Sequence, residues 1–299
     1  MTGIAAALAK WTARVESRGP ADWSFSLSNG ARLSARLRLE DDWLALDIPL
    51  NGRHSQRSPW TLVCLNAELP GSCKLVHRPG SSLPTLATDL PLECDADLTT
   101  RLGDACHGLA GAFARLDNKP DEDRGHPATP PEEHQDDLER LCSDAGWPLQ
   151  KGTNGTLVVE TGAELLEEGP DERRRFLGQG IIGGVPRRLQ LQALSQGVRV
   201  WLTLARFGSL SVESRKAVGI LLLRVSGAVR LARASVKKTD AGSELQVEVS
   251  LPRTPSASEI DHALSAVCVA AVRCGPELAS LQHRSLATKY VELSTKTVS

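Results

Sequence analysis

Apolar residues recur along this chain with two different periods, and each change of period marks a new element. Near the N-terminus four apolar residues are spaced 4, 3 and 4 apart, which places one stripe on a helix: Ile4, Leu8, Trp11 and Val15. Beyond residue 20 the period becomes two, over 23–27, 33–39 and 44–48. Asn29-Gly30 lies between two of these alternating runs, as in a tight hairpin, so the pattern predicts three antiparallel strands.

The rest of the first half continues as a short helix over 60–69, strands at 73–77 and 85–92, and a long helix over 98–116. The second half repeats this order. It begins with a helix around 138–145 and a strand at 156–160, followed by a hairpin of 189–193 with 198–204. A very apolar helix over 215–227, strands at 229–236 and 244–251, and a final helix over 260–271 complete it.

Between the halves, residues 117–135 contain four prolines, an excess of acid and no aliphatic side chain larger than alanine. Such a segment cannot bury a core, and it predicts a linker. The expected organisation is a domain at 1–116, the linker at 117–135, a second domain at 136–277 and a polar tail at 278–299. Aligning Leu90-Pro91 with Leu251-Pro252, with one inserted residue, brings Leu98, Leu102 and Cys106 onto Ile260, Leu264 and Cys268. This match favours an internal duplication over two unrelated α+β domains.

The repeated order of helix, three strands, helix, two strands and helix resembles the class I type III secretion chaperones, also called the CesT or Tir-chaperone family, and the related YbjN-like proteins. The resemblance is most specific at Leu65-Asn66-Ala67-Glu68-Leu69-Pro70-Gly71, Lys74-Leu75-Val76 and Leu86-Ala87-Thr88-Asp89-Leu90-Pro91-Leu92. The second copy departs from it in two ways: it has no Asn at the matching place, and it carries an insertion at 161–186. The sequence therefore predicts an α+β fold of two tandem chaperone-like domains, each with the order α-β-β-β-α-β-β-α.

Members of that family are usually single domains that pair as homodimers, so the resemblance implies that the two halves of this chain form a pseudo-dimer within one polypeptide. In the family the middle helix and its neighbouring strand contribute to the dimer contact. The interface expected from this involves Leu62, Leu65, Ile220, Leu222 and Leu223. The resemblance also implies apolar grooves for a client beside the first helix, at Leu8, Trp11 and Val15.

Composition agrees with a globular protein, because 41% of the residues are hydrophobic and 24% are charged. The first residues show no basic lead before their apolar run, and no apolar stretch is long enough to span a membrane, so we expect a cytoplasmic protein. The seven cysteines are scattered and never spaced C-x-x-C, which argues against a disulfide framework or a zinc ribbon. We interpret them as reduced, mostly buried thiols.

No motif in the sequence supplies a catalytic mechanism, a metal site or a cofactor site. Residues 178–183 match the string G-x-G-x-x-G, but no buried strand precedes them and no acidic residue follows at the distance that binds a ribose. Cys106 and His107 are adjacent on the predicted long helix, where neighbouring side chains point about 100 degrees apart. This pair therefore cannot act as a nucleophile and its base without other groups. The histidines form no metal-ligand pair at helical spacing. We therefore expect no enzyme, no metal and no cofactor.

Charge is nearly balanced over the whole chain, with 35 Lys and Arg against 36 Asp and Glu, but it is unevenly distributed. The acidic excess lies in 120–172 and the basic excess in 173–299. Either the acidic segment lies over the basic half, or a basic patch meets an anionic partner through Arg173, Arg174, Arg175, Arg187 and Arg188. Nucleic acid is disfavoured because aromatic residues for base stacking are scarce.

Two hypotheses about function follow. The first is a non-enzymatic protein-binding module, a cytoplasmic chaperone that holds a client polypeptide such as a secreted effector. The alternative is a regulatory or structural component of a secretion apparatus that docks through its basic C-terminal half. Neither requires nucleic acid or a membrane span, and in both the chain is a monomeric pseudo-dimer.

Overall fold

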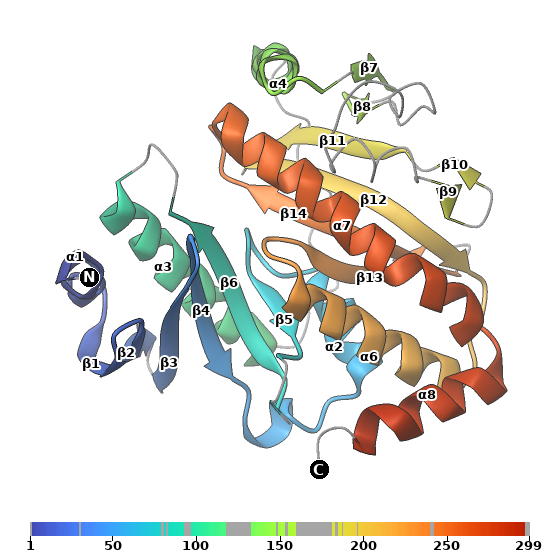
Figure 1. The fold of residues 1–299 in the computed structure, drawn as a ribbon, viewed down its shortest axis with the longest axis horizontal. Coiled ribbons are helices and arrows are strands. Elements are labelled where there is room, and N and C mark those ends of the chain that lie inside the picture. Colours follow the sequence, from blue (N-terminus) through green and yellow to red (C-terminus); the bar gives the residue numbers. More distant parts are fainter. Residues whose placement is uncertain are drawn as a thin grey trace.

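The computed structural model describes residues 2–29, 31–78, 81, 83–92, 97–117, 133–147, 149–152, 155–159, 181–182, 185–186, 188–195, 197–239 and 242–296. The predicted fold class is confirmed: the protein is α+β, with two six-stranded antiparallel sheets and helices packed on them. Figure 1 shows the N-terminal half, in blue to teal, beside the C-terminal half, in yellow to red. The two sheet-and-helix units fit the tandem layout that the sequence predicts.

The first half begins with helix α1 (Thr2–Ala9) and has strand order β1-β2-β3-β4-β6-β5. Helices α2 (Pro59–Asn66) and α3 (Leu98–Asp117) belong to the same half, and a 3-10 turn, η1 (Gly52–His54), precedes α2. α3 covers the face of the sheet that carries the alternating apolar residues. The strands are β1 (Ala13–Gly19), β2 (Asp22–Asn29), β3 (Ala31–Glu40), β4 (Trp43–Pro49), β5 (Lys74–Val76) and β6 (Thr85–Pro91).

The second half has strand order β7-β8-β11-β12-β14-β13, which repeats that of the first half element by element. Its helices are α4 (Glu133–Asp144), α6 (Val212–Ala228), α7 (Ala257–Leu281) and α8 (Arg284–Lys296). A short hairpin, β9 (Ile181–Ile182) with β10 (Val185–Pro186), lies within the inserted segment. The sheet strands are β7 (Leu149–Lys151), β8 (Leu157–Val159), β11 (Leu189–Leu194), β12 (Gly197–Phe207), β13 (Arg233–Thr239) and β14 (Gly242–Leu251).

Strand register and burial match between the halves as well as strand order. Leu44 pairs with Leu90 in the first sheet, and Val198 pairs with Leu251 in the second. On α3 the buried apolar side chains are Leu102, Ala105, Cys106, Leu109, Ala112 and Leu116, and each has a buried counterpart at a constant spacing on α7: Leu264, Val267, Cys268, Ala271, Cys274 and Leu278. The same helix face packs on the same sheet face in both halves, which supports the internal duplication.

The structure corrects the prediction at the first strand of each half. The expected first helix through Val15 is wrong, because α1 ends at Ala9 and residues 13–19 form β1 at the edge of the sheet. β1 reads ARVESRG and its side chains are mostly exposed, so it lacks the apolar alternation by which strands are recognised. β7 has only three residues and was missed for its brevity. Each half therefore has six sheet strands rather than five.

The predicted polar tail at 278–299 is also wrong over the described part of that segment. α7 continues to Leu281, and α8 packs against α6 with Ala287 fully buried. α8 is polar on average, and its inward face consists of Ala287, Tyr290, Val291 and Ser294, so few large aliphatic residues mark it in the sequence. Of the linker predicted at 117–135, residues 118–132 lie outside the described residues, while Asp117 ends α3 and residues 133–135 begin α4.

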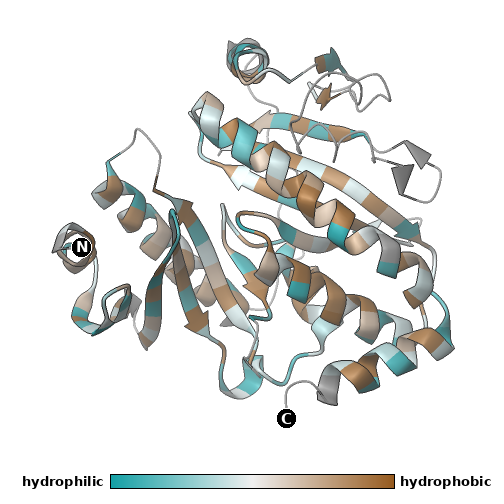
Figure 2. Cartoon of the chain, viewed as in Figure 1, coloured by the Kyte–Doolittle hydropathy of each residue, from teal (hydrophilic) through white to brown (hydrophobic). Residues whose placement is uncertain are grey.

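α6 is apolar nearly all round, which predicts cover on more than one side. The structure confirms this, because α2, α7, α8, β5 and β13 all contact it. Figure 2 shows brown, hydrophobic segments along α6, and brown segments that alternate with paler or teal ones along the strands. No described helix is both long enough and apolar enough to cross a bilayer.

Candidate functional site at the junction of the two halves

The two halves meet through their middle helices. α2 and α6 lie against each other, so the expected contact between the 60–69 segment and the apolar helix is present. The helices approach very closely at Gly219, where an added Cβ would lie 2.6 Å from the backbone nitrogen of Trp60. The residues expected at this interface are buried or half-buried: Leu62, Leu222 and Leu223 are buried, and Leu65 and Ile220 are intermediate.

Each middle helix ends in a polar side chain that binds the following strand of its own half. The Asn66 side chain accepts a hydrogen bond from the Leu75 amide at 2.6 Å and donates to the Leu75 carbonyl. It also donates to the Ala234 carbonyl in the other half, at 2.9 Å. In the second half the Ser226 hydroxyl accepts from the Ala234 amide at 2.8 Å. Ser226 therefore stands where the second copy lacks the expected Asn.

Two buried cations cross the junction in opposite directions from equivalent strand positions. Lys74 on β5 donates to the carbonyls of Val229 and Ala232, at 2.8 and 3.3 Å. Arg233 on β13 donates to three carbonyls of the first half, those of Leu69, Gly71 and Cys73, at 2.9 to 3.1 Å. This reciprocity, in which each half contacts the loop before the other's strand, is what a two-fold-related interface requires.

Lys74 and Arg233 each have a buried acid beside them. Lys74 Nζ lies 2.7 Å from Asp89 on β6, and Arg233 Nε lies 3.0 Å from Glu248 on β14. Burial alone would raise the pKa of the Glu248 carboxyl, but Arg233, Arg199 and other nearby cations lower it to about 2. Both carboxylates are therefore charged at neutral pH. Burying them costs little free energy only while their cationic partners are in place.

Asp89 is the centre of an ion network that spans both halves. Besides Lys74 it is bound by Arg78 from its own half and by Arg230 from the loop after α6. Burial raises the pKa of the Asp89 carboxyl, but Lys74 and Arg78 outweigh it, so the net direction is downward. Arg78 also binds Asp47 at 2.9 Å, and Arg230 binds Glu40. The network lies on the sheet face opposite α3, which the alternating pattern would leave in water.

A strained turn supports this loop. Leu231 has φ of 60°, in the left-handed region that a branched side chain rarely adopts, and its amide donates to Asp89. In the loop of the first half the positive φ, 52°, lies at Gly71, three residues before Lys74 rather than two, where glycine carries no penalty. Leu231 is nevertheless buried, and it lines the space between the halves.

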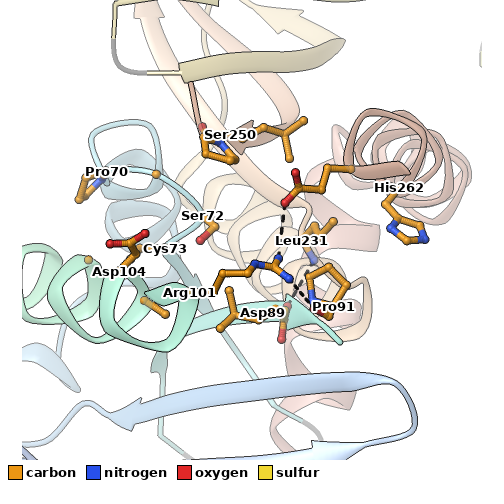
Figure 3. Close-up of a pocket in the computed structure, with 17 residues that line it drawn as sticks. Pro70, Ser72, Cys73, Asp89, Pro91, Arg101, Asp104, Leu231, Ser250 and His262 are labelled. Atoms are coloured by element: carbon orange, nitrogen blue, oxygen red, sulfur yellow. Dashed lines mark hydrogen bonds and ion pairs between the residues drawn. The ribbon is translucent and has the colours of Figure 1, made fainter. Parts of the chain in front are cut away.

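That space is a cavity of about 290 Å³ that both halves enclose, here called the junction cavity (Figure 3). Both Leu-Pro dipeptides line it, Leu90-Pro91 from β6 and Leu251-Pro252 from the end of β14. α3 contributes Arg101 and Asp104, and α7 contributes Glu259 and His262. Arg101 donates to the Pro91 carbonyl at 2.8 Å and to Glu259 at 3.5 Å.

The residues predicted to hold a client do not form one exposed groove. Leu8 is fully buried in the core, and Val15 lies on β1. Trp11 is 43% exposed and follows α1; its indole N–H donates to the Thr99 carbonyl of α3 at 2.8 Å. An added Cβ at Gly103 would lie 2.6 Å from the indole ring, so Trp11 rests on α3 while part of its side chain stays exposed.

The proposed basic patch lies almost wholly outside the described residues. Arg173, Arg174, Arg175 and Arg187 belong to that part of the chain, and Arg188 is exposed. Most of the glycine string at 178–183 lies there too, apart from the short strand β9. Other arginines of the second half, among them Arg224, Arg230 and Arg233, bind partners within the protein.

The described cysteines are unpaired thiols. Burial raises the pKa of Cys73, Cys106, Cys142 and Cys268 to about 12, so these thiols are poor nucleophiles at neutral pH. The neighbour of Cys106, His107, is exposed and its ring packs at the edge of Trp11, 5.5 Å between centroids. Within the described residues, no group of three or more His, Cys, Asp or Glu side chains could hold a metal ion.

Sequence reasoning did not find the charged residues of the junction. Lys74, Asp89, Arg233 and Glu248 alternate with apolar residues on half-buried strands, where polar residues normally face water. Asn66, Lys74 and Asp89 belong to the segments that carry the resemblance, but their role as contacts between the halves was not visible in the sequence. A scan against protein-family models found no match to this chain, and neither a search of curated proteins nor one of solved structures found any.

Proposed function

We propose that this protein is a non-enzymatic, cytoplasmic tandem chaperone that holds a client polypeptide, as its resemblance to the secretion chaperones suggests. The observation that carries the proposal is the reciprocal junction. Two copies of one unit face each other through the middle helix and the following strand, with Lys74 and Arg233 in equivalent positions. This is the pairing that the resemblance implies for the two subunits of a dimer.

The chemistry of the buried groups agrees with a binding role. The junction acids and cations satisfy one another and the neighbouring carbonyls, and the described thiols are held in their neutral form by burial. Such fully paired groups fix the relative position of the two halves. They leave apolar surface such as the exposed part of Trp11 to contact a client.

The first test is purification of the tagged full chain from its own cells, identification of bound proteins, and reconstitution of the purified pair. A polypeptide that rebinds in a fixed stoichiometric ratio supports the proposal. Recovery of secretion-apparatus components alone would favour the alternative, docking as a regulatory or structural component. If no protein rebinds the purified chain, the proposal fails.

With that client in hand, the kind of contact can be measured by titration at low and high ionic strength. Capture through apolar surface predicts little salt dependence and several-fold weaker binding for Trp11→Ala. Val212→Ala serves as the control, because Val212 is 71% exposed at the start of α6 and lies away from Trp11. Strong salt dependence without an effect of Trp11→Ala would reject apolar capture.

A further inference from the structure

The junction cavity has apolar walls and a small volume. Its lining includes three prolines, which restrict the backbone around it: Pro70, Pro91 and Pro252. Leu90, Leu231 and Leu251 add further apolar lining. At about 290 Å³ the cavity lies at the lower end of the range for ligand pockets, so it suits one extended side chain or a small molecule rather than a folded element.

The cations around the cavity are already bound. Arg101 is the basic residue that reaches into it, and its guanidinium is shared between the Pro91 carbonyl and Glu259. Lys74 and Arg230, just beyond the wall, are held by Asp89. An anionic ligand would therefore have to displace a carboxylate or a carbonyl from one of these groups.

In contrast to these paired cations, one acidic residue at the cavity has no partner within the described ranges. Asp104 on α3 lines the cavity, is exposed, and has no hydrogen-bond or ion-pair partner among the described residues. Figure 3 shows it on the opposite side of Arg101 from His262. His262 supplies a second unused polar atom, because its Nδ1 is buried without a partner in the described part of the chain. The cavity therefore has a carboxylate at one side and a histidine at the other, and this histidine also packs at the edge of Trp43.

From this arrangement we propose that the junction cavity binds an aliphatic chain that ends in a primary ammonium group. The apolar chain lies against the leucine and proline walls, and the ammonium pairs with Asp104. A lysine side chain has this form, so we identify the occupant as a lysine of the client. This identification rests on the proposed function, whereas the binding of an alkylammonium group rests on the cavity alone.

The cavity can be tested with small probes and no client. Hexylammonium, hexanol and hexanoate are titrated against the full chain, and the ring resonances of His262 are followed by NMR, since this side chain lines the cavity. We expect saturable shifts with hexylammonium, weaker ones with hexanol and none with hexanoate. Equal affinity for hexanol and hexylammonium, or no shift of His262 with any probe, would overturn the proposal.

A charge-neutral variant tests the role of the acid. Asp104→Asn keeps the shape and should weaken hexylammonium binding about two- to fivefold, as expected for a partly solvated ion pair, while hexanol binding stays unchanged. Asp137→Asn is the control, because the Asp137 side chain is 70% exposed on α4 and outside the cavity. An unchanged affinity of Asp104→Asn for hexylammonium would reject the ammonium site. If hexylammonium binds but no client polypeptide binds the full chain, the ammonium site is supported and the chaperone proposal is refuted.

Discussion

Replacing Arg233 by methionine tests whether the reciprocal cations hold the two halves together. The side chain is 7% exposed, and methionine keeps much of its length and apolar stem. The variant removes the donor for three carbonyls of the first half and leaves Glu248 with Arg199 as its remaining close cation. Breaking one partner of a buried ion pair typically costs about 3–5 kcal/mol, and we expect a loss of unfolding free energy in that range.

The conservative variant Arg233→Lys separates charge from geometry. An ammonium can serve this environment in part, as Lys74 does in the other half with two carbonyls and Asp89. It lacks the planar fork that reaches several acceptors at once. We expect a loss of about 1–2 kcal/mol, the size of one or two hydrogen bonds to a charged group.

Urea unfolding at pH 7, followed by circular dichroism and by tryptophan fluorescence, measures both losses. The control is Arg206→Met on the same sheet, where the arginine side chain is 79% exposed and bound to Glu244. A surface pair of this kind contributes roughly 0–1 kcal/mol. If Arg233→Met lost less than about 1 kcal/mol, or no more than Arg206→Met, the buried cation would not be what joins the halves.

Three further predictions concern pH dependence, α6 and the helix contact. The pKa of Glu248 falls from 4.5 to about 2 on folding, so its stabilising contribution, at most about 3 kcal/mol, is complete above pH 4.5 and is lost as pH falls toward 2. Glu248→Gln should therefore unfold more readily at pH 7 but show a shallower loss of stability between pH 5 and 2, measured by urea titrations; an unchanged pH profile contradicts this. Leu222→Asp buries a charge without a partner and should lower the unfolding free energy by about 4 kcal/mol or more, whereas Val212→Asp at the exposed start of the same helix should change it little; similar melting temperatures would show that α6 is not buried. Gly219→Ala should be destabilising because its Cβ would meet the α2 backbone, while Gly111→Ala, with open space on α3, should stabilise by about 1 kcal/mol; calorimetry distinguishes the two, and stabilisation by both would refute the close helix contact.

The periodic pattern of apolar residues was enough to predict most of the elements. Burial is the main source of folding free energy, so strands with one buried face and helices with one buried stripe carry it visibly in their spacing. For the same reason the match of Leu102 and Cys106 with Leu264 and Cys268 indicates the duplication from the residue spacing alone, and both pairs are buried on equivalent helices. The signal fails where burial is slight, as at β1, and where the buried residues are few and small, as at α8.

Only the tertiary structure decided which polar faces are covered. Lys74, Asp89, Arg233 and Glu248 occupy the alternate positions of half-buried strands, and such positions lie in water unless another part of the protein covers them. Here each half covers the other, through the middle helix and the loop that follows it. The covering segment lies more than a hundred residues away along the chain, as with Arg233 and Leu69, so no local spacing records it. The junction cavity arises in the same way, because its walls come from two halves whose relative position the sequence pattern does not specify.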